Sequence, residues 1–366
     1  MREYLLVFVV AAVMTYAATP FVRWLAIATG AITAVRDRDV HAVPIPRLGG
    51  VAILVGFVAA LLVASRLPYL SQIFLGGEMK GVLIGAVIVC AVGVLDDIRE
   101  LDWLTKLAGQ ILAAGVMAFQ GVQLLSLPLF GVTVLPTPLL VAITILIVVI
   151  STNAVNFIDG LDGLAAGVVG IAGLAFFGYS YLLSRTYDPP NVFSSATFIT
   201  AALVGCCVGF LPHNFHPARL FMGDAGALLL GLLLAAATIS MTGSIDPSAQ
   251  VGGNAAAAIL LPVVLPLAIL SLPLLDVLLA VVRRTRAGRR PWHPDAQHLH
   301  HRMLKIGHSH VRAVLLLYLW AAVVALGAMS FAYVDGWLPF LGISVIAVSA
   351  MVLTIWLPRW MPGRRS

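Results

Sequence analysis

A series of long apolar segments constrains this 366-residue chain more than any other feature. A helix needs about 20 apolar residues to cross a bilayer, and most of the segments have about that length. Only 10% of the residues are charged, against about 25% in soluble proteins, so a water-facing surface cannot be built. We predict one all-α polytopic membrane domain over residues 1–366, with about eleven transmembrane helices. They are placed near residues 4–28, 48–65, 81–95, 104–120, 138–153, 162–184, 195–211, 225–241, 255–283, 311–332 and 338–357.

Cysteine content and net charge exclude two other classes of protein. The three cysteines all lie inside apolar segments, which indicates neither a disulfide framework nor a zinc cluster. The net charge of +6 comes from arginines beside apolar segments rather than among aromatic residues, so we expect no nucleic-acid partner. The first apolar segment could be a cleaved signal peptide, but its continuation to Arg23 favours a retained helix.

The distribution of basic residues predicts the orientation. If the N-terminus lies outside and the C-terminus lies in the cytoplasm, most of the 22 Lys and Arg residues are cytoplasmic. The exceptions on the outer side are Arg2, Arg66, Lys80 and Arg185. All nine histidines then lie on the cytoplasmic side, and residues 121–137 could form a short outer β-hairpin. Any chemistry is therefore expected on five cytoplasmic loops, at 30–47, 96–103, 153–162, 212–224 and 284–310.

Two of these loops carry paired or regularly spaced polar residues. Asp96 and Asp97 are adjacent at a helix end and need Mg²⁺ or a basic side chain to keep both charges, although a solvated turn is the alternative. A second loop follows the pattern NAVNFIDGLDGL, with oxygen-bearing side chains at three-residue spacing. This spacing would place all four side chains on one face of a helix or turn, which would suit a metal or a nucleotide. Helix capping is the alternative, but it would use only one of the four side chains. These four residues are Asn153, Asn156, Asp159 and Asp162.

Asp224, in the sequence FMGDAG, opens a helix whose free N–H groups favour anions. It could bind a metal or act only as a helix cap. The loop at 36–50 contains two prolines and a Gly-Gly pair, and His41 or Arg47 could supply a hydrogen-bond donor there.

The loop at 284–310 is basic and rich in histidine. Without cysteine its HLHH sequence favours phosphate oxygens over zinc, while lipid headgroups are an alternative ligand for its arginines. Its candidate residues are His298, His300, His301 and Arg302.

Taken in order, the motifs PxPRxGG, LDD, NAxNxxDGxDGL, FMGDxG and HLHHR resemble the polyprenyl-phosphate N-acetylhexosamine-1-phosphate transferases, the family of WecA, TagO and MraY. The resemblance spans residues 36–302. It implies a Mg²⁺-dependent enzyme, with Mn²⁺ as a substitute, in the bacterial inner membrane. Such an enzyme moves a sugar 1-phosphate from a UDP-sugar to undecaprenyl or decaprenyl phosphate and releases UMP, and homodimers occur in the family.

The resemblance also implies roles for the motif residues. Asp224 would be the main Mg²⁺ ligand, with Asp96 and Asp97 near the metal and the lipid phosphate. Asp159 and Asn156 would contact the sugar-nucleotide, and Asp162 and Phe221 would frame the uracil. The diphosphate would be held by His298, His300, His301 and Arg302.

Three alternatives to this assignment stay open at the level of the sequence. HLHHR resembles the WecA and TagO branch, which uses UDP-GlcNAc, rather than the MraY branch, which uses a UDP-muramoyl pentapeptide. A transporter for an anionic lipid or nucleotide-sugar would move its substrate without making a bond. A non-catalytic lipid-binding scaffold would tolerate the change Asp224→Asn.

Overall fold

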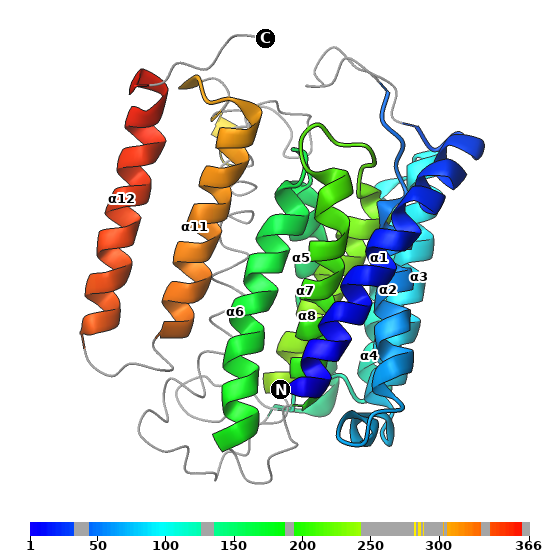
Figure 1. Ribbon diagram of the computed structural model, residues 1–366. Coiled ribbons are helices and arrows are strands. Elements are labelled where there is room, and N and C mark those ends of the chain that lie inside the picture. The colour runs from blue at the N-terminus through cyan, green and yellow to red at the C-terminus, as the bar shows by residue number, and fades with distance from the viewer. Residues whose placement is uncertain are drawn as a thin grey trace.

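The apolar segments form α-helices in the computed structural model of the chain (Figure 1). The structure describes residues 1–32, 44–125, 135–186, 194–242, 306–330 and 337–360, with a few isolated positions between 282 and 303. The helices are α1 (Arg2–Ala28), α2 (Gly49–Ala64), α3 (Glu78–Arg99), α4 (Trp103–Phe119), α5 (Thr137–Ile158), α6 (Leu164–Thr186), α7 (Ser194–Asn214), α8 (Gly223–Thr242), α11 (His310–Ser330) and α12 (Leu338–Trp360), with a short 3-10 helix η1 (Leu70–Phe74).

The predicted all-α class and all but one of the predicted helices are confirmed. The exception, at 255–283, lies outside the described residues, as do positions 126–134 of the hairpin considered for the outer face. No strand occurs within the described ranges. An isolated antiparallel β-bridge joins Ile32 and Pro46.

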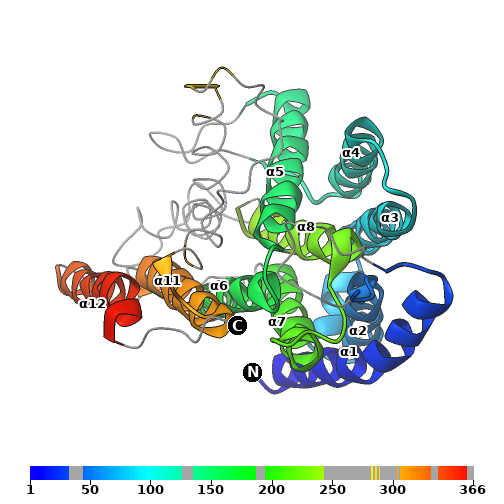
Figure 2. The ribbon, with the colours of Figure 1, turned by 90° about the horizontal axis from the view of Figure 1, so that it is seen from above.

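Helix α8 is the centre of the bundle. Its whole apolar window is buried, and it packs against α2, α3, α5 and α7. Viewed from above, α4 lies outside α3 and α5, whereas α6, α11 and α12 follow one another outward from α7 (Figure 2). The start of α8 is therefore surrounded by the ends of several other helices.

Glycines allow α2 and α3 to approach the first turn of α8 closely. A Cβ atom on Gly50 would lie 2.2 Å from the backbone nitrogen of Gly226, and one on Gly93 would lie 2.3 Å from the Cα of Ala225. Both distances are far shorter than a van der Waals contact, so neither position has room for a side chain. This packing fixes the place of Asp224 relative to α3.

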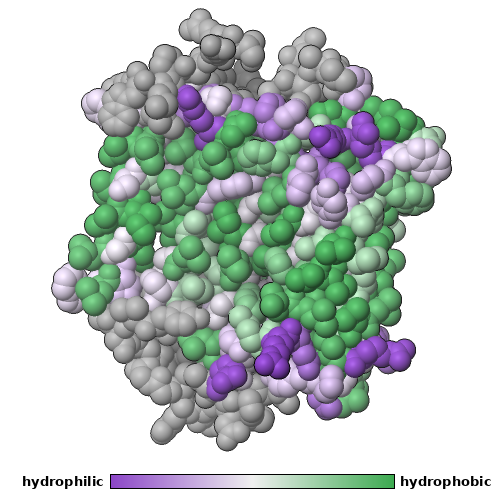
Figure 3. All heavy atoms as spheres, in the orientation of Figure 1, coloured by the Kyte–Doolittle hydropathy of each residue, from purple (hydrophilic) through white to green (hydrophobic). Residues whose placement is uncertain are grey.

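The surface of the bundle agrees with a multi-pass membrane protein. Among the described residues, eight helices are long and apolar enough to cross a bilayer, and α2 and α4 are shorter apolar helices. On the face shown in Figure 3, apolar side chains cover the middle of the described part of the molecule, and polar side chains gather toward its two ends. Helix α1 begins at one end of the bundle, and α12 finishes at the other.

Candidate active site

The carboxylates at the end of α3 are held in place by backbone groups. The last turn of α3 is followed by Glu100, whose φ of 49° lies in the left-handed region, and the chain then turns towards α4. Leu101 donates its backbone N–H to Asp96 Oδ1 at 2.8 Å. Both aspartates are largely buried, with side-chain exposure of 12% at Asp96, so the solvated-turn interpretation does not hold.

Asp97 joins α3 to the start of α8. Its two carboxylate oxygens accept hydrogen bonds from the backbone N–H groups of Asp224 and Ala225, at 3.0 and 3.2 Å. These N–H groups have no partner within their own helix, so Asp97 supplies the acceptors that the helix terminus needs. Asp97, not Asp224, thus provides this capping interaction.

Gly223 is required where Asp97 meets α8. Its φ is +69°, and a Cβ atom there would lie 2.3 Å from Asp97 Oδ2. A side chain at this position would therefore be strained and would also displace the carboxylate. The glycine of the FMGD motif is explained by this close approach.

Lys106 connects two carboxylates that are far apart in the sequence. Its Nζ lies 3.0 Å from Asp96 Oδ2 and 2.8 Å from Asp224 Oδ2, and all three side chains are partly buried. Lysine was not among the site residues expected from the sequence. The signal that could have found it is its position one helical turn into α4, directly after the aspartate-rich loop.

The cap of α4 fixes the position of Lys106. Asp102 accepts hydrogen bonds from the backbone N–H groups of Leu104 and Thr105, both at 3.0 Å. The Thr105 hydroxyl also donates to Asp102 and lowers the pKa of that carboxyl group. Helix α4 therefore starts at a defined residue, and Lys106 is directed at α3 and α8.

The end of α5 adds an amide and another carboxylate to this cluster. Asn156 interacts with the carboxylate of Asp224. Burial, together with the neighbouring charges of Asp224 and Asp97, raises the pKa of Asp159 to about 7, while Arg47 opposes the shift. A site that crowds carboxylates in this way has a high affinity for a cation. We refer to Asp96, Asp97, Lys106, Asn156, Asp159 and Asp224 as the carboxylate cluster.

The expectation that four oxygen-bearing side chains share one face of the α5 loop is wrong. Helix α5 continues to Ile158, five residues beyond its predicted end, so Asn153 is still within it. The Asn153 amide donates to Gln110 Oε1 of α4 at 2.6 Å and does not join the carboxylate cluster. Asp162 follows the turn after α5 and faces a different set of partners.

The proline-containing segment before α2 pairs with the FMGD loop. Phe221 donates its N–H to the Pro46 carbonyl at 2.9 Å, and its own carbonyl accepts from Gly49 N–H at 3.0 Å. Gly50 N–H donates to Met222 O at 3.0 Å. These bonds place Arg47 beside the carboxylate cluster, where its charge acts on Asp159.

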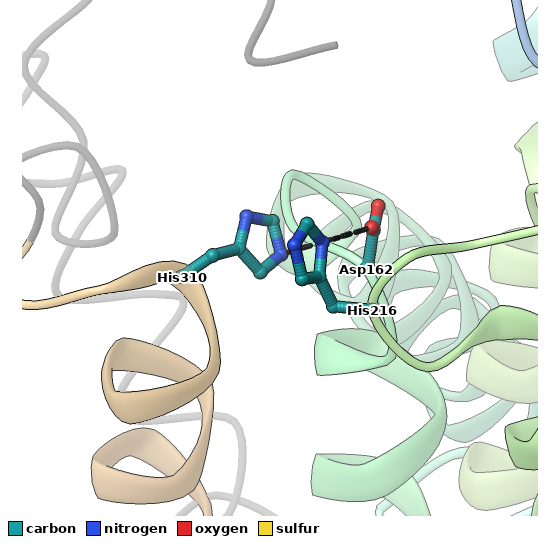
Figure 4. A group of neighbouring side chains, drawn as sticks. All are labelled: Asp162, His216 and His310. Atoms are coloured by element: carbon teal, nitrogen blue, oxygen red, sulfur yellow. Dashed lines mark hydrogen bonds and ion pairs between the residues drawn. The ribbon is translucent and has the colours of Figure 1, made fainter. Parts of the chain in front are cut away.

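Asp162 belongs to a second group of side chains, with His216 and His310 (Figure 4). Its charge acts on Asp159 of the carboxylate cluster. Its carboxylate is fully buried and lies 2.8 Å from His216 Nδ1 and 4.0 Å from His310 Nε2. The backbone N–H of Ala218 donates to the same oxygen, Oδ2, at 3.1 Å. The five remaining site residues expected from the sequence lie outside the described residues: His41, His298, His300, His301 and Arg302.

Comparison with known proteins agrees with the motifs. Residues 79–242 match glycosyl transferase family 4. The chain is 46% identical to a decaprenyl-phosphate N-acetylglucosaminephosphotransferase of Mycolicibacterium smegmatis, over 97% of this chain and 88% of the relative. It is 30% identical to a probable undecaprenyl-phosphate N-acetylglucosaminyl 1-phosphate transferase of Bacillus subtilis, over 94% and 90% of the two chains. A phospho-N-acetylmuramoyl-pentapeptide-transferase of Desulforudis audaxviator is also 30% identical, over 80% and 85%.

The helical membrane bundle of the described residues, its carboxylate cluster and the transferase relatives together define the class of protein as a membrane-embedded transferase. The chain belongs to glycosyl transferase family 4, among the polyprenyl-phosphate N-acetylhexosamine-1-phosphate transferases. The resemblance expected from the motifs is confirmed.

Proposed function

We propose that this protein transfers N-acetylglucosamine 1-phosphate from UDP-GlcNAc to a membrane polyprenyl phosphate and releases UMP. The observation that carries the proposal is the carboxylate cluster, which joins α3, α4, α5 and α8 at the end of the bundle where the FMGD loop lies. The names of relatives that match nearly the whole chain support the substrates. A transporter or a lipid-binding scaffold has no comparable support.

The donor set fits Mg²⁺. Asp224 and Asp96 present carboxylate oxygens within reach of one cation, and Asn156 and Asp159 add further oxygen atoms, the ligand type that Mg²⁺ prefers. Asp97 would support this arrangement through the backbone of Asp224. When bound, Mg²⁺ (or Mn²⁺ in its place) would neutralise diphosphate charge and polarise the phosphorus–oxygen bond.

Both substrates are anions, so the side chains must reduce their repulsion before they can meet. Lys106 would bind a phosphate oxygen once a cation takes its place between Asp96 and Asp224. Arg47 adds positive charge on the other side of the cluster. In our proposal His41, His298, His300, His301 and Arg302 would hold the remaining diphosphate oxygens.

The chemistry requires little proton transfer from the protein. The second pKa of a phosphate monoester is about 6, so the attacking oxygen of the lipid phosphate is mostly ionised at neutral pH. This oxygen would attack the β-phosphorus of UDP-GlcNAc in line with the bond that breaks, and the electron pair of that bond would leave with UMP. The bond between sugar and phosphate stays intact. A route through a covalent aspartyl phosphate is the alternative.

Phe221 would frame the uracil ring from the FMGD loop. A contact between Asp162 and uracil stays a prediction, since the carboxylate is buried and bonded to the protein itself. A homodimer also stays a prediction.

Placement in the plasma membrane follows from the two substrates. The lipid tail needs hydrocarbon, while its phosphate and the UDP-sugar need water, so we place the carboxylate cluster at the cytoplasmic headgroup level. The excess of arginine on the loops at that end supports this orientation.

A panel of donors tests the choice of sugar. Purified protein is incubated with Mg²⁺, a polyprenyl phosphate and one donor at a time. The donors are UDP-GlcNAc, another UDP-N-acetylhexosamine and UDP-muramoyl pentapeptide, and the lipid product is identified by mass spectrometry. We expect product with UDP-GlcNAc at a kcat/KM at least about 10²-fold above that with the muramoyl donor, which corresponds to about 2.7 kcal/mol. Preference for the muramoyl donor would show that the assignment to the GlcNAc branch is wrong.

A further inference from the structure

Three side chains from three separate segments converge beside the carboxylate cluster. Asp162 comes from the turn between α5 and α6, His216 from the loop between α7 and α8, and His310 is the first residue of α11. One ligand atom from each lies within 4.8 Å of the other two. Figure 4 shows both imidazole rings on the same side of Asp162. None of these histidines has a role in the proposed transfer.

We infer that Asp162, His216 and His310 form a binding site for a transition-metal ion, with Zn²⁺ as the best match. Imidazole and carboxylate donors together suit zinc, whereas Mg²⁺ prefers oxygen ligands alone. The site would therefore select a different ion from the carboxylate cluster. The bound ion would have a structural role, because it would hold α11 against the loops around the active site.

The distances fit one ion shared by three ligands. Donors about 2.1 Å from a tetrahedral zinc ion lie about 3.4 Å apart. The observed separations from Asp162 Oδ2, 2.8 Å to His216 Nδ1 and 4.0 Å to His310 Nε2, lie on either side of that value. The rings are stacked with an interplanar angle of 18°, so they would turn out of this stack for both nitrogen atoms to point at one ion.

Charge and burial also favour a cation at this place. The Asp162 carboxylate has no exposed surface, so a positive charge nearby offsets the cost of keeping it ionised. The two imidazole rings lie side by side, with centroids 4.2 Å apart. Neutral imidazole is the form that binds metals. One ion bound by both rings would thus place a positive charge beside the buried carboxylate.

The surroundings match a structural site that solvent can reach. His216 keeps 36% of its side chain exposed, which leaves room for a water molecule as fourth ligand. Beneath the three residues lies an apolar cluster that includes Leu161, Leu164, Ala313 and Val314. Tyr318 of α11 also donates a hydrogen bond to the Gly163 carbonyl in the same turn. An ion would add to contacts that already join α11 to this turn.

The test counts zinc on the purified full-length protein. The protein is stripped with EDTA, exposed to ZnCl₂, passed through size exclusion, and its monodisperse fraction is analysed by elemental mass spectrometry. The variants are His216→Asn and His310→Gln, whose amides can replace the imidazole hydrogen bonds but are poor zinc ligands. We expect wild type to hold one more zinc per chain than either variant, and Zn²⁺ to raise the Tm of wild type only.

The control variant is His213→Gln, at the end of α7. Its ring packs against Tyr16, with centroids 4.7 Å apart, and it is not one of the three ligands. This variant should bind as much zinc as wild type. The other histidines of the loop at 284–310 are unchanged in every variant and contribute equally to every sample. Equal zinc in wild type and His310→Gln would overturn the proposal and leave a hydrogen-bonded Asp–His pair with a stacked ring. Transfer activity is not a readout here, so the outcome is independent of the proposed function.

Discussion

The variant Asp224→Asn should lose transfer activity by about 10²–10³-fold in kcat, without losing the fold. The amide has nearly the same shape as the carboxylate but no charge, so it weakens both the contact with Lys106 and the affinity for a cation. The backbone N–H of residue 224, which bonds to Asp97, is unchanged by the substitution. The measurement is initial rate against Mg²⁺ concentration, together with the Tm of the purified variant.

The matched control for this variant is Asp102→Asn. Asp102 is an exposed aspartate near the cluster, and asparagine caps a helix about as well as aspartate does. We expect its kcat to stay within about twofold of wild type. If Asp224→Asn keeps more than a tenth of the wild-type kcat, or if the control loses as much, the carboxylate cluster is not the reaction centre.

The second large effect is expected for Lys106→Met. Removing the ammonium group takes away a phosphate ligand. When no Mg²⁺ is bound, it also leaves Asp96 and Asp224 close together without a positive charge beside them. We expect kcat/KM for the lipid phosphate to fall by about 10²–10³-fold. Lys106→Arg, which keeps the charge but not the shape, should lose less.

Thermal unfolding separates the two roles of Lys106. In the absence of divalent ions the Tm of Lys106→Met should lie below that of wild type, because the two carboxylates repel each other. Added Mg²⁺ should then raise the Tm of the variant more than that of wild type. An unchanged Tm and an unchanged kcat/KM would show that the contacts of Lys106 are incidental.

Much of the fold could be predicted because bilayer crossing depends mainly on the length and polarity of a segment. The ends of helices were harder to predict, since polar residues continue a helix when a neighbouring helix satisfies them. Asn153 illustrates this: its amide bonds to Gln110 of α4, and α5 therefore runs to Ile158. Sequence spacing could not reveal that partner.

Site residues could be predicted where the residue type and its spacing indicate a role. They were harder to predict where the role depends on tertiary contacts. Two adjacent aspartates at a helix end identified Asp97, and an aspartate flanked by glycines identified Asp224. Their joint role at the start of α8 nevertheless depends on how α3 packs there. Lys106 and His310 were not predicted as site residues because a single lysine or histidine in a long sequence carries no pattern. Their roles depend on partners 118 residues away for Lys106 and far along the chain for His310.

The central claim is that the sugar leaves UDP together with one phosphate. UDP-GlcNAc radiolabelled in its β-phosphate is incubated with purified protein, polyprenyl phosphate and Mg²⁺, and the lipid and nucleotide products are separated. We predict that the label moves to the lipid, that UMP is released in equal amount, and that neither occurs without the lipid acceptor. Label retained in released UDP would contradict the account, because it would show transfer of the sugar alone.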